Sequence, residues 1–105
     1  MATGKIKISE KEVQNAILQY LQVKRVFHFR NNTGATKTAT GGFIKFGTPG
    51  SPDIIVVKEG IFIGIEVKRP GGKLSPNQKL FCDALIAAGG RYVVAQSLED
   101  VMEIL

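Results

Sequence analysis

Apolar residues near the N-terminus recur at the spacing of one helix face. Ser9 can cap such a helix, and Glu12 stands three residues later, as in a capping box. The pattern predicts a helix that ends near residues 22–24, followed by a short strand over residues 26–30. The apolar face of this helix consists of Val13, Ala16, Ile17, Tyr20 and Leu21.

Two apolar runs in the middle of the chain are typical of buried strands. Residues 54–57 are continuously apolar, and a second strand follows over residues 61–68 after the tight turn Lys58-Glu59-Gly60. Near the C-terminus we expect a strand over residues 91–96 and a short helix over residues 97–105. None of these apolar runs is long enough to span a bilayer.

A second long helix is expected between the last two strands. Ser75 can cap it, with Pro76 in its first turn and Gln78 at the capping-box position, and Gly89-Gly90 ends it. The element order α-β-β-β-α-β-α therefore predicts an α/β fold with a mixed central sheet flanked by helices. The apolar face of this helix consists of Phe81, Ala84, Leu85 and Ala88.

The segment between the first two strands has a different composition. Residues 32–50 are rich in glycine and threonine and contain one short apolar stretch, Phe43 to Phe46. We expect a long mobile loop with a hairpin arm folded from it, because loops of this length are usually functional or disordered. We also expect residues 1–8 to be a flexible N-terminus. All 105 residues are interpreted as a single domain.

Charge and cysteine content narrow the class of protein. Lysine and arginine number 14 against 9 acidic residues, so the formal charge is +5, which favours polyanionic partners such as nucleic acid. Cys82 is the only cysteine, which excludes an internal disulfide, and we interpret it as a buried thiol of the second long helix. Since no apolar leader follows Met1, we expect a reducing cytoplasm, in a bacterial or phage-infected host cell.

Strand alternation places two charged side chains on one face of the strand over residues 61–68. Glu66 and Lys68 lie roughly 7 Å apart along that face, beside the open space expected at Gly64. Such a pair on its own is also typical of a solvated strand end. Asp53 changes this interpretation, because a hairpin brings the outer ends of its two strands together and allows Asp53 to approach Glu66.

Two converging carboxylates repel each other unless a cation or a proton lies between them. Oxygen ligands of this kind suit Mg²⁺ or Mn²⁺, and the backbone carbonyl of Val67 can complete the protein's share of the ligands. Such a metal would activate water and polarise a phosphate, with Lys68 beside it to offset negative charge. Zinc is not indicated, because His28 and Cys82 are the only residues of their types.

The residues around this cluster resemble a known group of nucleases. Gly50-Ser51-Pro52-Asp53, with Ile65-Glu66-Val67-Lys68 after a strand turn, resembles the PD-(D/E)xK nuclease pattern. The upstream helix with Glu12, and Leu74 to Gln78 downstream, resemble more specifically the VRR-NUC (virus-type replication–repair nuclease) group. The resemblance extends from about Ser9 to Val101. It implies a restriction-endonuclease-like core and metal-dependent cleavage of phosphodiester bonds.

The same resemblance implies roles for five side chains. Asp53 and Glu66 would be metal ligands, and Lys68 would be the catalytic lysine. Glu12 matches the family's acid on the first helix, placed to touch the metal or its waters. Gln78 matches the family's glutamine on the helix after the catalytic strand. Each of these last two residues also has a purely structural interpretation, as a member of a capping box.

Basic residues around the cluster are candidates for DNA contacts. Such side chains contact phosphates and carry no base readout, so structure-selective cleavage is favoured over sequence specificity. The lysines of the long loop are also compatible with an ordinary solvated surface. The candidate DNA-binding residues are Arg30, Lys37, Lys45, Arg69 and Lys73.

Substrate and assembly follow from the same resemblance. Stand-alone phage and bacterial members of this size resemble Holliday junction resolvases, which implies branched DNA such as a four-way junction. Symmetrical cleavage of a junction needs two active sites, so we expect a homodimer. Its interface is expected at the arm (Phe43, Ile44, Phe46) or at the second long helix. The alternatives are flap, nick or duplex cleavage by a repair- or restriction-type nuclease, and a non-catalytic DNA-binding module.

Overall fold

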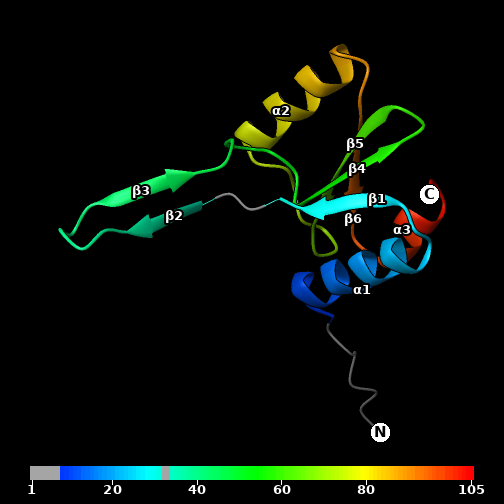
Figure 1. The fold of residues 1–105 in the computed structure, drawn as a ribbon, viewed down its shortest axis with the longest axis horizontal. Helices are drawn as coiled ribbons and strands as arrows, with labels where there is room; N and C mark the ends of the chain where they lie inside the picture. The colour runs from blue at the N-terminus through cyan, green and yellow to red at the C-terminus, as the bar shows by residue number, and fades with distance from the viewer. Residues whose placement is uncertain (1–7, 32–33) are drawn as a thin grey trace, which may run out of the picture.

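A four-stranded mixed sheet with helices on both faces forms the centre of the molecule and confirms the predicted α/β fold (Figure 1). The computed structural model describes residues 8–31 and 34–105. The expectations for residues 1–7 and for residues 32–33 lie outside the described residues. None of the described helices is long and apolar enough to cross a membrane. The elements in chain order are α1 (Glu10–Val23), β1 (Phe27–Arg30), β2 (Gly34–Lys37), β3 (Phe43–Phe46), β4 (Ile54–Lys58), β5 (Ile61–Val67), α2 (Pro76–Ala87), β6 (Arg91–Ala95) and α3 (Leu98–Met102).

The strand order of the main sheet is β1-β4-β5-β6. β4 is antiparallel to β5 because a two-residue turn returns the chain directly, and it is also antiparallel to β1. β6 is parallel to β5, since the connection between them contains α2 and is long enough for a crossover. The register pairs Ile54 with Ile65, so the start of β4 and the end of β5 meet at one end of the sheet.

α1 and α3 cover one face of the sheet and enclose the core. The side chains of Ile63, Ile65 and Val67 on β5 are buried there, as strand alternation predicts. Ser9 caps α1: its Oγ accepts a hydrogen bond from the backbone N–H of Glu12 at 3.1 Å, and such a cap contributes about 1 kcal/mol. The buried residues of this core are Val13, Ile17, Leu21, Ile54, Val56, Ile63, Ile65, Val67, Ala95 and Val101.

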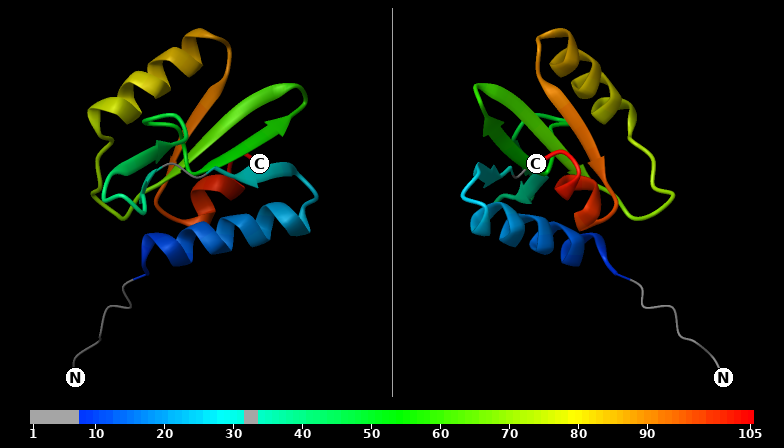
Figure 2. Two further views of the ribbon diagram at one scale, coloured as in Figure 1. Left: turned by 60° about the vertical axis from the view of Figure 1, so that its left-hand side comes forward. Right: turned by 90° about the vertical axis from the view of Figure 1, so that its right-hand side faces the viewer.

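α2 lies on the opposite face of the sheet, above β6 (Figure 2). None of its residues is fully buried, and Leu85 packs against Gly64 of β5 and against Gly90 just before β6. The open space expected at Gly64 is absent, and that expectation was wrong. A Cβ atom at Gly64 would lie only 2.6 Å from Cγ of Pro52. Gly64 therefore lets the segment before Asp53 pack directly on β5.

Residues 34–46 contain the expected hairpin arm. β2 and β3 form a separate two-stranded sheet that pairs Lys37 with Phe43. The arm extends away from the main sheet (Figure 1). Phe43 and Ile44 are exposed on it. A two-stranded hairpin is only marginally stable by itself in water. The arm is therefore a segment that a partner molecule could stabilise.

Candidate active site

Asn31 holds the loop that presents Asp53. Its Nδ2 amide donates hydrogen bonds to Oγ of Ser51 at 2.8 Å and to the carbonyl of Pro52 at 2.9 Å. Its backbone N–H donates to the carbonyl of Asp53 at 2.8 Å. These three bonds join the end of β1 to the start of β4. Sequence reasoning missed Asn31, because a single asparagine after a strand is ordinary in loops.

Gly50 holds the same loop against the start of α2. Its φ is +79°, and a Cβ atom there would lie 2.2 Å from the backbone oxygen of Asn77. Glycine is required because it tolerates this left-handed conformation and has no side chain to separate the two backbones. The loop before Asp53 is therefore fixed on two sides, by β1 and by α2.

Asp53 and Glu66 come together where β4 begins and β5 ends. The Oδ2 atom of Asp53 accepts a hydrogen bond from the backbone N–H of Val67 at 2.8 Å, so its carboxylate reaches across to β5. The pairing of Ile54 with Ile65 explains this position, because the next residue outward on each strand is Asp53 or Glu66. Glu66 is only 4% exposed, which is rare for a carboxylate.

Burial and the charge of Asp53 both disfavour ionisation of Glu66. The pKa of Glu66 is raised to about 8, first because the carboxyl group is desolvated, then because Asp53 repels its charge and hydrogen-bonds to its protonated form. Lys68 opposes this shift, with Nζ 4.0 Å from Oε2 of Glu66. Oε1 of Glu66 is buried without a hydrogen-bond partner. A cation could therefore replace the proton and satisfy both carboxylates.

Two acids of α1 have different partners near this cluster. Oε1 of Glu10 accepts a hydrogen bond from the backbone N–H of Arg69 at 3.1 Å, and its charge also raises the pKa of Glu66. Glu12, the acid singled out from the sequence, accepts a hydrogen bond from Oγ of Ser9 at 3.2 Å and lines a pocket of about 770 Å³. Sequence reasoning missed Glu10, because either acid suits the first turn of a helix.

Gln78 forms a capping box at the start of α2. Its Oε1 accepts a hydrogen bond from the backbone N–H of Ser75 at 2.8 Å, and its own backbone N–H donates to Oγ of Ser75 at 3.2 Å. The structure therefore gives Gln78 the capping role that its sequence position allows. A contact between Gln78 and a substrate stays a prediction.

Two of the candidate DNA contacts lie at the end of the sheet that carries the carboxylates. Arg30 ends β1 next to the start of β4, and Arg69 follows the end of β5; both are exposed. Because Arg30 pairs with Ile54, its side chain belongs to the face covered by α1 and not to the face of Glu66. Lys73 is exposed in the connection that leads to α2. Lys37 and Lys45 belong to the arm, on β2 and β3, and are therefore separate from the other three.

The donor atoms of the cluster fit a hard divalent cation. Within residues 8–31 and 34–105 no group of three or more His, Cys, Asp or Glu residues is positioned to hold a metal ion. Mg²⁺, however, commonly uses only one or two carboxylates, with waters and phosphate oxygens as its other ligands. Asp53 and Glu66 supply such a pair, and the buried carboxyl group of Glu66 has an oxygen without a hydrogen-bond partner.

A comparison with known protein families agrees with this geometry. The family model for the VRR-NUC domain matches residues 8–99, which include Asp53, Glu66 and Lys68. The match begins just before α1 and ends within α3, so it spans the whole sheet and both of the longer helices. No curated protein matches the chain.

Proposed function

The chain belongs to the VRR-NUC family, and on this premise we propose that it is a metal-dependent, structure-selective DNA endonuclease of the Holliday junction resolvase kind. A VRR-NUC domain is a nuclease of the PD-(D/E)xK type, so the activity of this chain belongs to the class of nucleic-acid cleavage. One observation carries the proposal. Asp53 and the buried Glu66 converge beside Lys68 at one end of the sheet.

Each residue of the cluster has a distinct proposed role. Asp53, Glu66 and the backbone carbonyl of Val67 would hold Mg²⁺ or Mn²⁺. When bound, such a cation polarises a phosphate oxygen and lowers the pKa of a coordinated water. Lys68, with Nζ 4.0 Å from Glu66, would stabilise negative charge that develops on the phosphate. The backbone N–H of Val67 orients Asp53 for its role through the 2.8 Å hydrogen bond.

DNA would be held mainly through its phosphates. Arg30 and Arg69 are exposed at the same end of the sheet as the carboxylates, so they are the residues proposed to contact the strand that is cut. Lys73, Lys37 and Lys45 would contact phosphates farther away. Phosphate contacts do not read base sequence, which supports selection by DNA shape.

A homodimer would provide the two active sites that a four-way junction needs. Its proposed interface includes the aromatic patch, which consists of Phe27 and Phe29 on β1. These rings pack edge to face at 6.4 Å and are 66% and 50% exposed. They lie on the sheet face that carries Glu66, beyond the part covered by α2. The exposed Phe43 and Ile44 of the arm would add to the interface.

A cleavage panel tests the proposed activity. Four-way junctions, flaps, splayed arms and plain duplex are incubated with Mg²⁺, Mn²⁺ or EDTA, and we expect metal-dependent cutting that is fastest on junctions. Asp53→Ala and Lys68→Ala should each slow cutting by about 100-fold or more while largely sparing DNA affinity. Glu59→Ala, which removes an exposed acid in the β4–β5 turn, is the matched control and should be fully active.

The same panel separates the alternatives. Faster cutting of flaps, nicks or duplex than of junctions would favour a repair- or restriction-type nuclease that uses the same residues. DNA binding without cleavage under every metal condition would favour a non-catalytic binding module and contradict the proposal. Full activity of Asp53→Ala or Lys68→Ala would show that the active site lies elsewhere.

A further inference from the structure

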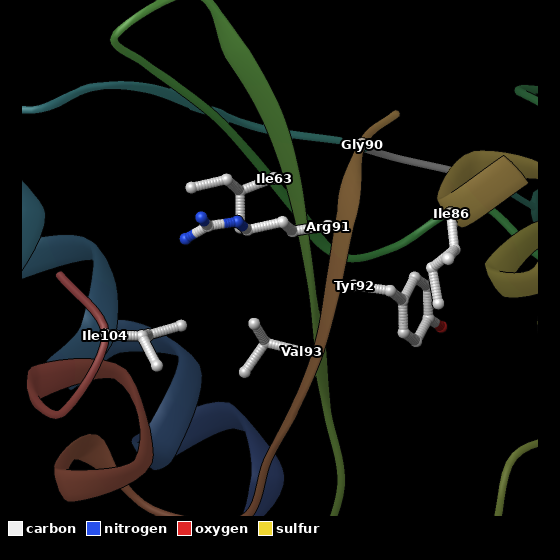
Figure 3. A pocket seen from close by; sticks show the side chains of 7 residues that line it. All are labelled: Ile63, Ile86, Gly90, Arg91, Tyr92, Val93 and Ile104. Atoms are coloured by element: carbon white, nitrogen blue, oxygen red, sulfur yellow. The ribbon is translucent and has the colours of Figure 1, made fainter. Parts of the chain in front are cut away.

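Tyr92 on β6 faces the carboxylate cluster from the neighbouring strand. The parallel register pairs Tyr92 with Gly64, two residues before Glu66 on the same face of β5. Figure 3 shows the Tyr92 ring beside Ile86 of α2, whereas Ile63 and Val93 point to the other side of the sheet. Gly64 has no side chain, so β5 itself places none between the Tyr92 ring and Glu66 along this face, and Pro52 and Leu85 pack over Gly64.

Two buried polar atoms on this face have no partner. Among the described residues, the only buried side-chain oxygens or nitrogens without a hydrogen bond are Oε1 of Glu66 and the hydroxyl of Tyr92. A buried polar atom without a partner costs about 1–3 kcal/mol, so two of them in one place call for an explanation. One is a carboxylate acceptor and the other a hydroxyl donor, so a hydrogen bond between them would satisfy both.

The surroundings of Tyr92 keep its hydroxyl protonated. Burial raises the pKa of the phenol above its ordinary value, and the charges of Glu66, Cys82 and Asp53 raise it further. A phenol is protonated at neutral pH in any case, so the hydroxyl of Tyr92 is a hydrogen-bond donor there. The two oxygens of Glu66 are also distinct, since Oε2 lies 4.0 Å from Nζ of Lys68 while Oε1 is buried without a hydrogen-bond partner.

We propose that Tyr92 is a positioning residue: when a metal is bound, its hydroxyl donates a hydrogen bond to Oε1 of Glu66 and thereby turns Oε2 toward the metal. This inference rests on the proposed metal-dependent nuclease function. It assigns Tyr92 no contact with DNA or with the metal. Hydrogen bonds to a ligating carboxylate fix its orientation, and their loss usually weakens metal affinity or activity by about 10- to 100-fold.

Binding of Mn²⁺ alone, without DNA, tests this role. Calorimetric titrations at pH 8 compare the wild type with Tyr92→Phe, which keeps the ring and removes only the hydroxyl. We expect the Kd for Mn²⁺ to rise by about 10-fold or more in Tyr92→Phe. The matched control is Tyr20→Phe on α1, which is half-buried on the opposite face of the sheet and should bind Mn²⁺ like the wild type.

A second measurement separates positioning from folding. Because the hydroxyl has no partner in the metal-free protein, the urea midpoint of metal-free Tyr92→Phe should equal or exceed that of the wild type. Wild-type affinity for Mn²⁺ in Tyr92→Phe would overturn the inference and leave the nuclease proposal intact. A wild type that binds no Mn²⁺ and cuts no DNA would instead overturn the proposed function, and this inference with it.

Discussion

At the scale of single residues, the two acids of α1 differ in the contacts that they make near the carboxylate cluster. Glu10 accepts the backbone N–H of Arg69 and acts electrostatically on Glu66, whereas Glu12 bonds to Ser9 within its own helix turn. The family resemblance points to an acid on this helix. The contacts favour Glu10 for that role, because it alone of the two has a described bond to the segment that follows Lys68.

The first prediction concerns these two acids. Glu10→Gln should slow metal-dependent cleavage by about 10-fold or more, because it removes a charge near Glu66 and weakens the bond that holds Arg69. Glu12→Gln should leave cleavage close to the wild-type rate, since an amide oxygen can also accept the hydrogen bond from Ser9. Initial rates on one junction with saturating Mg²⁺ measure both. A larger loss for Glu12→Gln would restore Glu12 as the family acid.

The second prediction concerns Glu66 in the metal-free protein. Its pKa is raised from 4.5 to about 8, so between these pH values the folded protein keeps a proton that the unfolded chain releases. Stability should therefore fall as pH rises from about 4.5 to 8 and should level off above that range. Urea unfolding in EDTA at several pH values measures this slope.

Glu66→Gln provides the control for this effect. Glutamine has the shape of the protonated acid and does not titrate, so the variant should lose most of the slope and be more stable than the wild type at pH 8 in EDTA. Glu59→Gln, at an exposed acid, should retain the wild-type slope. A wild-type slope in Glu66→Gln would mean that other groups govern the pH dependence.

Sequence reasoning located some of these residues and missed others for physical reasons. Glu66 and Lys68 share a face by strand alternation, which is a local property that two-residue spacing reveals. Placing Asp53 beside Glu66 required the register of the β4–β5 hairpin, and the short turn between these strands makes that register predictable. Asn31, by contrast, contacts a segment twenty positions away, and Glu10 contacts one fifty-nine positions away. Contacts of this kind depend on tertiary packing and leave no local pattern.

At the scale of elements, helices and strands were predictable where burial is periodic. α1 has its expected buried face, and the β4–β5 hairpin has its expected turn. α2 differs, because Phe81 and Leu85 of its predicted apolar face are half-buried and Ala84 and Ala88 are exposed. This helix covers only the β6 side of the sheet. Its sequence predicts an apolar face but not how much of that face the sheet will bury.

The third prediction concerns the arm. Replacing residues 34–46 with a short glycine-serine linker should weaken junction binding by about 10-fold or more. The replacement removes Lys37 and Lys45, and with them the backbone N–H groups of the arm that are proposed to bind phosphates. The urea midpoint should stay unchanged, because β2 and β3 pair only with each other. Fluorescence anisotropy with labelled junctions at two salt concentrations measures the change. Unchanged affinity would show that the arm does not contact DNA.

At the scale of the whole molecule, the candidate active site and the exposed aromatic patch of Phe27 and Phe29 share one sheet face. α1 and α3 cover the other face completely enough to bury ten core residues, whereas α2 leaves Phe27 and Phe29 uncovered beside the β4–β5 hairpin. The sequence predicts that this chain should form a dimer, but it does not predict this patch. In a four-residue strand, alternation does not show which face a neighbouring helix will cover.

The fourth prediction concerns this aromatic patch. Phe27→Ser combined with Phe29→Ser should raise the dimer dissociation constant by about 10-fold or more, because exposed aromatic side chains contribute strongly to interfaces. Analytical ultracentrifugation over a range of concentrations measures the change. The matched control is Val23→Ser, which removes a 73% exposed apolar side chain from the end of α1 and should leave the dimer intact.

Cleavage of a junction gives an independent readout of the same variant. Each of its active sites is intact, so it should still cut DNA with Mg²⁺, but it should release singly nicked junctions where the wild type makes paired cuts. Supercoiled cruciform plasmid distinguishes the two outcomes, because a single nick relaxes the plasmid and paired cuts linearise it. A wild type that is monomeric at all concentrations yet linearises the plasmid would show that paired cutting does not need a dimer.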